Sequence, residues 1–148
     1  MNKLLLFGLA SLLTLAGGVA QAQSYSPQLN KENPREWGEP VEFTVTSKAF
    51  EKKGIAPVPM KLQVRFKKKI VMGCQYEYQL TNASDKQAVD CEDMYAVSDQ
   101  KYNEKLKPGQ SVIFLANTMT RCGDKKAKDD TPCLDCQPSF YIPTVSPK

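Results

Sequence analysis

The strongest constraint on the fold is a strict alternation of apolar and polar residues. Met60–Phe66 reads Met-Lys-Leu-Gln-Val-Arg-Phe, and a second run of this kind follows at Cys74–Leu80. Because successive side chains of a β-strand point to opposite faces, each run predicts a strand with one buried and one solvent-exposed face. Weaker patterns predict further strands at Val41–Thr46, Val89–Val97, Ser111–Thr120 and Phe140–Ile142. No amphipathic helical pattern exceeds two turns, so the predicted fold class is all-β.

The segment Ser111–Thr120 has apolar residues on both faces. Val112 and Phe114 point one way, whereas Ile113 and Leu115 point the other. A strand of this kind is typical of the centre of a sheet or of a sheet covered on both sides. We therefore expect this strand to be central in its sheet or to be covered on its second face.

The N-terminus has the pattern of a signal peptide. Lys3 supplies a positive charge, Leu4–Ala20 is apolar, and Ala20-Gln21-Ala22 offers the small residues of a cleavage site. The alternative, a retained membrane anchor, is disfavoured because the apolar run is short and no basic cluster follows it. We predict that residues 1–22 are removed, that no transmembrane anchor remains, and that the protein is secreted or periplasmic.

The remaining chain is long enough for one domain. Residues 23–40 are polar and proline-containing, and they predict an extended lead-in with Trp37 docked on the domain edge. An exposed Trp37 that contacts a ligand is the alternative. Residues 41–148 are expected to form the β-domain, including a Cys-rich loop at 121–137.

All five cysteines follow the predicted cleavage site: Cys74, Cys91, Cys122, Cys133 and Cys136. Export to an oxidising compartment favours disulfide bonds, and the odd number leaves one cysteine unpaired or bonded elsewhere. We expect Cys122 to pair with Cys133 or Cys136, which would close the polar loop.

A bond between Cys74 and Cys91 requires their strands to be neighbours. If the turn-forming residues Asn82–Lys86 made a tight hairpin, Cys74 would instead lie near Met94. That offset of about three residues exceeds the reach of a disulfide. Both arrangements remain open from the sequence.

Cys133-Leu134-Asp135-Cys136 is the one motif with possible chemistry of its own. A redox pair of this spacing works at a helix N-terminus, which lowers the pKa of the first thiol. Pro138 leaves little room for such a helix, and no βαβ pattern surrounds the motif. Structural disulfides are therefore favoured over redox activity or metal binding.

Composition argues against most catalytic classes. The chain contains no histidine, which removes Ser-His-Asp and Cys-His systems and the usual histidine-containing metal sites. Asp90, Glu92 and Asp93 are neighbours on one predicted strand, whereas a glycosidase needs two carboxyl groups facing each other across a cleft. We therefore expect no catalytic residue, no cofactor and no metal site.

Arg65, Lys67, Lys68 and Lys69 form a basic cluster, the candidate partner-binding patch. One interpretation is a surface for an anionic glycan, lipopolysaccharide, acidic lipid or protein partner. The other, which we favour, is that the lysines protect a strand edge from aggregation, with Glu42, Glu51 and Glu77 neutralising part of the charge. Nucleic acid is not an expected partner of an exported protein.

Two turn motifs carry a resemblance to a known family. The pairing of Tyr78–Lys86, which contains Asn-Ala-Ser-Asp-Lys, with Leu106-Lys107-Pro108-Gly109-Gln110-Ser111 resembles exported bacterial immunoglobulin-like domains. The resemblance covers about Tyr76–Phe114 and implies an immunoglobulin-like antiparallel β-sandwich, here with a disulfide-stapled C-terminal loop. Such domains usually bind, space or scaffold, although a fold does not fix a function.

The function expected from these observations is a non-catalytic binding or scaffolding module of the bacterial envelope. One alternative is a periplasmic thiol-redox or metal-handling protein that uses Cys133 and Cys136. A second is an exported inhibitor or adhesion factor that uses the basic cluster or the loop at Lys125–Asp130.

Overall fold

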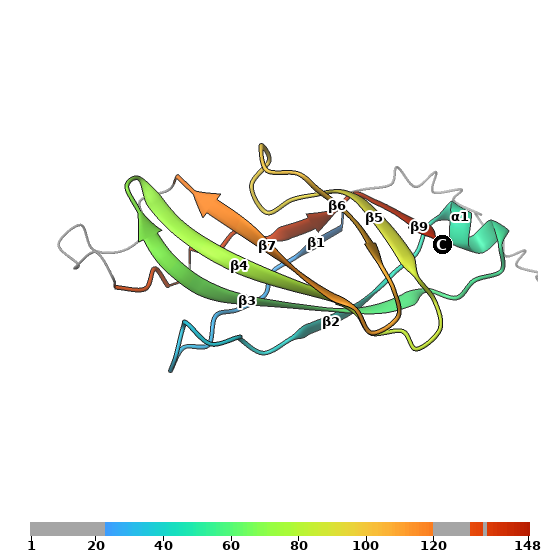
Figure 1. Cartoon of the computed structure of the whole chain (residues 1–148), viewed down its shortest axis with the longest axis horizontal. Helices are drawn as coiled ribbons and strands as arrows, with labels where there is room; N and C mark the ends of the chain where they lie inside the picture. The colour runs from blue at the N-terminus through green and yellow to red at the C-terminus, as the bar shows by residue number, and fades with distance from the viewer. Residues whose placement is uncertain (1–22, 120–130, 135) are drawn as a thin grey trace, which may run out of the picture.

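The computed structural model describes residues 23–119, 131–134 and 136–148 (Figure 1). The predicted signal peptide, Cys122, the Lys125–Asp130 segment and most of the predicted Cys-rich loop lie outside these residues. In order, the described elements are β1 (Gln23–Tyr25), β2 (Val41–Val45), α1 (Lys48–Lys52), β3 (Val58–Ile70), β4 (Gly73–Asn82), β5 (Val89–Met94), β6 (Tyr102–Leu106), β7 (Ser111–Thr118), β8 (Phe140–Ile142) and β9 (Thr144–Pro147). The predicted all-β class is confirmed.

The larger sheet has four antiparallel strands in the order β2-β3-β4-β7. Its centre is the long hairpin of β3 and β4, which pair from Met60 opposite Asn82 to Ile70 opposite Gly73. The apolar residues of both alternating runs are buried, as the sequence predicts: Met60, Leu62, Val64, Phe66, Cys74, Tyr76, Tyr78 and Leu80.

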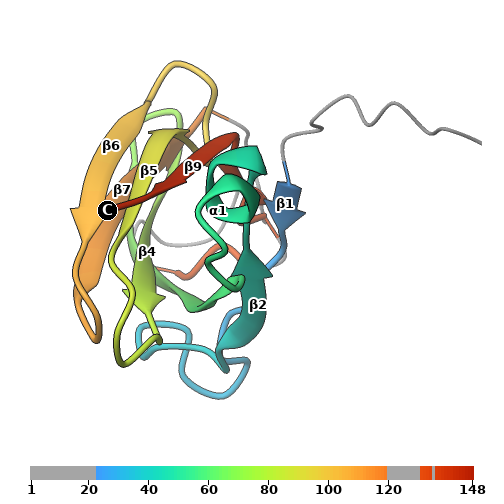
Figure 2. The same cartoon turned by 90° about the vertical axis from the view of Figure 1, so that its right-hand side faces the viewer.

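A second layer packs on the buried face of this sheet. It contains the three-stranded sheet β6-β5-β9, and the short pair β1-β8 lies beside it (Figure 2). A bridge between Tyr95 and Tyr141 connects the chain just after β5 to β8. Val89, Cys91 and Phe140 of this layer join the side chains of the larger sheet in one apolar core.

The expected position of the strand at 111–120 is wrong. β7 lies at the edge of its sheet, and its second face is open, with Ile113 50% and Leu115 37% exposed. On the free edge of β7, side chains rather than a neighbouring strand form hydrogen bonds with part of the backbone. The Tyr102 hydroxyl donates to the Leu115 carbonyl at 2.6 Å, and the Asn117 amide donates to Gln100 Oε1 at 3.1 Å.

The alternation signal does not detect β1, β6, β9 or the short helix α1. These elements are three to five residues long, which is too short for a period to stand out. α1 carries Phe50, which is fully buried. The first residues of the 23–40 segment belong to the fold, because β1 pairs with β8.

The two turn motifs meet at Asn82, whose side chain is fully buried. Asn82 Nδ2 donates to the Leu106 carbonyl at 3.1 Å and to the Gln87 carbonyl at 2.8 Å, and the Gly109 amide donates to the Asn82 carbonyl at 2.9 Å. This turn takes the chain from β4 to β5, which lie in different sheets. Two arrangements were considered for Cys74: a disulfide bond to Cys91, and a tight hairpin that would place Cys74 near Met94. Because β4 and β5 are in different sheets, neither occurs.

Candidate functional site

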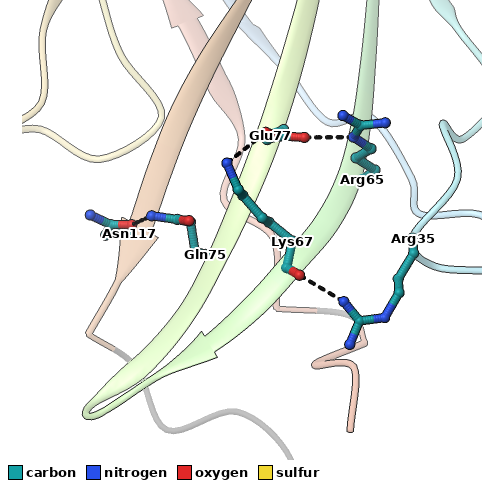
Figure 3. A network of polar contacts seen from close by, with 6 residues as sticks. All are labelled: Arg35, Arg65, Lys67, Gln75, Glu77 and Asn117. Atoms are coloured by element: carbon teal, nitrogen blue, oxygen red, sulfur yellow. Dashed lines mark hydrogen bonds and ion pairs between the residues drawn. The ribbon is translucent and has the colours of Figure 1, made fainter. Parts of the chain in front are cut away.

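The basic cluster lies along the outer half of the β3–β4 hairpin, and the structure divides it into two parts. Arg65 and Lys67 share a single carboxylate on β4, that of Glu77 (Figure 3). Arg65 Nε lies 2.6 Å from Glu77 Oε2, and Lys67 Nζ lies 3.0 Å from Glu77 Oε1. The expectation that Glu77 neutralises part of the cluster is confirmed, whereas Glu42 pairs with Lys61 at 3.0 Å.

The 23–40 segment holds this network from the other side. The Arg65 guanidinium stacks on Trp37 at 4.3 Å from the ring centroid. Arg35 Nη1 donates to the Lys67 carbonyl at 2.7 Å and lies over the Phe66 ring. Trp37 is half-buried against the edge of the sheet, so its predicted docking is confirmed. Arg65 and Lys67 of the predicted patch are therefore fixed in place by these neighbours.

Burial by itself raises the pKa of Glu77, but the hydrogen bonds and charges of Lys67 and Arg65 outweigh it and hold the pKa below its usual value. A lowered folded-state pKa contributes stability above the unfolded-state pKa of about 4.3, and this contribution is lost as the pH falls through the folded value.

We expect Glu77→Gln to lower the free energy of unfolding by about 1 kcal/mol at pH 7, because the variant loses two charge-assisted hydrogen bonds that water partly screens. Urea denaturation from pH 7 to pH 3 checks this, and the two curves should converge at acid pH. Glu42→Gln removes an exposed ion pair and is the matched control, with an effect below about 0.5 kcal/mol. A constant difference between Glu77→Gln and the wild type at all pH values would contradict the ion-pair account.

Lys68 and Lys69 lie closer to the end of the hairpin. A register shift between Phe66 and Lys68 places Lys68 opposite Gln75 and Lys69 opposite Cys74. Cys74 points to the interior, so the shift puts Lys68 and Lys69 on opposite faces of the hairpin. The end of the hairpin thus carries a cationic residue on each face.

The sequence patterns did not detect an apolar group at this end of the molecule. Val71 and Met72 form the turn between β3 and β4, with Val71 fully exposed and Met72 54% exposed. Met119 and Leu134 are also exposed. The available signal was the turn itself, because two-residue hairpin loops favour Gly, Asn and Asp over Val-Met.

Met119 and Leu134 belong to the hairpin end because two contacts hold their segments there. Gly73 lies so close to β7 that an added Cβ would be 1.5 Å from the Thr118 carbonyl oxygen and 3.3 Å from Met119 Cα. The disulfide from Cys74 to Cys133 holds the residue before Leu134. In Figure 1 the hairpin turn and the end of β7 lie at one extreme of the long axis, opposite α1.

The structure excludes a bond between Cys74 and Cys91, and it excludes Cys133 as the partner of Cys122. Cys133 bonds to Cys74 across 59 residues of sequence, not to Cys122, and Cys91 is a free, buried thiol. Cys136 is also disulfide-bonded, to a partner outside the described residues. The other pairing expected from the sequence, Cys122 with Cys136, therefore stays a prediction. Burial, with a smaller contribution from Asp90, raises the pKa of Cys91 to about 12, so the thiol stays protonated.

This pairing bears on the redox alternative. Cys133 is bonded to β4 rather than to Cys136, and its side chain is buried. The two cysteines of the motif are therefore not arranged as one dithiol pair. Among the described residues, no group of three His, Cys, Asp or Glu side chains could hold a metal ion.

The carboxylates of β5 have structural neighbours. Asp90 forms an ion pair with Lys148 at 3.2 Å, and Asp93 lies 3.7 Å from Lys101. In the part of the chain that is described, no helix has the length and apolar character needed to span a membrane.

Comparison with protein-family models, curated proteins and solved structures finds no match to this chain.

Proposed function

We propose that this chain is an exported, non-catalytic binding or scaffolding module of the bacterial envelope, built as an immunoglobulin-like β-sandwich. The observation that carries the proposal is the hairpin end, defined here by Lys68, Lys69, Val71, Met72, Met119 and Leu134. An exposed apolar group with adjacent cations is typical of a surface that is covered by a partner.

The fold supports the proposal in two ways. Two antiparallel layers share one core, and the two turn motifs on which the family resemblance rests are joined through Asn82. The disulfide between Cys74 and Cys133 suits an oxidising compartment, in agreement with the signal-peptide pattern of residues 1–22.

The architecture also supports a rigid presentation of this surface. Glu77 compensates two cations in the outer half of the hairpin, and Trp37 packs against one of them. The disulfide fastens the segment of Leu134 to β4. A preorganised surface loses less conformational entropy on binding than a mobile one.

Fractionation of a bacterium that expresses the full chain tests the proposal. We expect the protein to begin at Gln23 after export and to remain with the envelope after gentle lysis. Val71→Ser/Met72→Ser should reduce this retention at least tenfold, because it removes two exposed apolar side chains from the hairpin end.

Ile113→Ser is the matched control, since Ile113 is a half-exposed aliphatic residue of β7 away from the hairpin end. Its retention should equal that of the wild type, and all variants should have the same thermal unfolding midpoint. Wild-type retention of the double variant, or a product that keeps residues 1–22, would contradict the proposal.

A further inference from the structure

We propose that the outer face of the larger sheet binds an acidic polysaccharide, whose carboxylates lie at Lys67 and Lys68 and whose hydroxyl groups bind the Gln79 amide. The outer face is the one turned away from the second layer. This inference rests on the proposed function, because it names a ligand class for the binding module.

The register of the strands arranges the side chains of the outer face in rows. Because Tyr76 and Tyr78 of β4 are buried in the core, the residues that alternate with them point to the outer face. Across β3, β4 and β7 the rows are Lys68-Gln75-Asn117, Arg65-Glu77-Leu115 and Gln63-Gln79-Ile113. Successive rows lie about 7 Å apart along a strand, so a linear polymer that follows β4 passes over all three.

The rows nearest the turn carry an excess of positive charge. Arg65 Nε and Lys67 Nζ share the Glu77 carboxylate, at 2.6 and 3.0 Å. Lys68 is exposed, and it forms no ion pair with the described residues. Three positive charges against one negative charge leave a surplus of two. Glu42, the other acid in the strands of this sheet, pairs with Lys61, so the charge surplus favours an anionic ligand.

The cations of these rows are already arranged to hold a carboxylate. Arg65 is packed on Trp37 at 4.3 Å from the ring centroid, and Glu77 fixes the Lys67 amino group (Figure 3). Their side chains remain 34% and 42% exposed, so both are also open to a ligand. Cations that are held in place lose less conformational entropy on binding than mobile ones.

Amide side chains supply hydrogen-bonding groups for the uncharged parts of a sugar. Gln79 lies at the centre of the face, is partly exposed, and its carboxamide forms no hydrogen bond with the described residues. Gln75 Nε2 donates to Asn117 Oδ1 at 2.6 Å, which leaves the Gln75 oxygen and the Asn117 nitrogen available (Figure 3). An amide offers both donors and acceptors, as a hydroxyl group does, so these side chains match sugar hydroxyls.

The composition of the rows favours a polysaccharide over a folded protein. The centres of protein interfaces are depleted in charged residues and enriched in aromatic ones. The centre of this face, along β4, instead consists of Gln75, Glu77 and Gln79. The aliphatic residues Ile113 and Leu115 lie at its β7 edge.

Calorimetry with a matched pair of oligosaccharides tests the inference with the purified, oxidised protein. We expect binding of oligomannuronate, and binding at least about tenfold weaker of a β-linked oligomannose of the same length, which lacks only the carboxylates. Lys67→Gln/Lys68→Gln should weaken binding of oligomannuronate about tenfold, because it removes two cations from the rows. Equal binding of the two oligosaccharides by the wild type would overturn the inference.

Lys52→Gln/Lys53→Gln is the matched control for net charge. It removes two exposed lysines from α1 and the residue after it, and α1 lies at the opposite extreme of the molecule (Figure 1). Its binding of oligomannuronate should equal that of the wild type. A loss as large as that of Lys67→Gln/Lys68→Gln would mean that overall charge, not the outer face, attracts the ligand.

Gln79→Ala separates recognition of a sugar from adsorption of any polyanion. It should weaken binding of oligomannuronate about fivefold, the usual effect of one hydrogen bond, and leave binding of polyaspartate unchanged. The same effect on both polyanions, or none on either, would overturn the assignment of a polysaccharide.

The failure of this inference is distinguishable from the failure of the proposed function. If the wild type binds no oligomannuronate while Val71→Ser/Met72→Ser still loses envelope retention in cells, only the ligand class is overturned. If the oligosaccharide binds with the expected pattern of variants while the protein keeps residues 1–22 or is not retained, the proposed function is overturned and the ligand class stands.

Discussion

Replacing both Cys74 and Cys133 by alanine is expected to lower the free energy of unfolding by about 4 kcal/mol. The bond closes a loop of 59 residues in sequence, so breaking it returns much chain entropy to the unfolded state. Both residues are buried, and alanine avoids placing an unpaired hydroxyl in the core. Urea denaturation of the oxidised proteins measures the difference.

Cys91→Ala is the control for the loss of a buried sulfur. Cys91 is as well buried as the bonded pair but makes no disulfide, so its replacement should cost only about 1 kcal/mol. If Cys74→Ala/Cys133→Ala is no less stable than Cys91→Ala, the disulfide bond does not stabilise the domain.

Tyr78→Ala is expected to lower the free energy of unfolding by about 3–5 kcal/mol, because it leaves a large cavity at the centre of the core. Tyr78 is fully buried, and its ring is stacked on that of Phe140 with the centroids 5.5 Å apart. The same denaturation measurement applies, with circular dichroism to confirm that the variant folds.

Tyr78→Phe separates the hydroxyl from the ring. The Tyr78 hydroxyl donates to the Pro138 carbonyl, and the neighbouring Tyr76 hydroxyl donates to the Cys133 carbonyl. Tyr78→Phe should cost about 1 kcal/mol, the usual effect of one hydrogen bond. A loss as large as that of Tyr78→Ala would mean that the C-terminal segment detaches when this hydrogen bond is absent.

The strands of the larger sheet could be predicted because their signal is local. Along β3 as far as Phe66 and along most of β4, successive residues alternate between the core and the opposite face, and consecutive positions of the sequence show that alternation. The position of β7 was not predictable, because whether a second apolar face is covered depends on elements far along the chain. Gln100 and Tyr102 satisfy the β7 edge, and their polar segment showed no such role in the sequence.

The candidate site was half predictable for a similar reason. The run Lys67–Lys69 marked the right part of the chain, and Glu77 was among the acids expected to compensate it. Which of these residues Glu77 pairs with, and that Lys68 and Lys69 lie nearer the turn on opposite faces, depended on the register of β3 on β4. The apolar group needed more, since Met119 and Leu134 reach the turn only through β7 and the disulfide.

The sequence by itself determined the all-β class, the strands of the central hairpin and their buried faces, because these depend on a period of two residues. Only the tertiary structure decided that Cys74 bonds to Cys133, that Asn82 joins two distant turns and that apolar residues gather beside the lysines. Each of these is a contact between residues separated by tens of positions. No local pattern encodes such a contact, because it depends on how the layers pack.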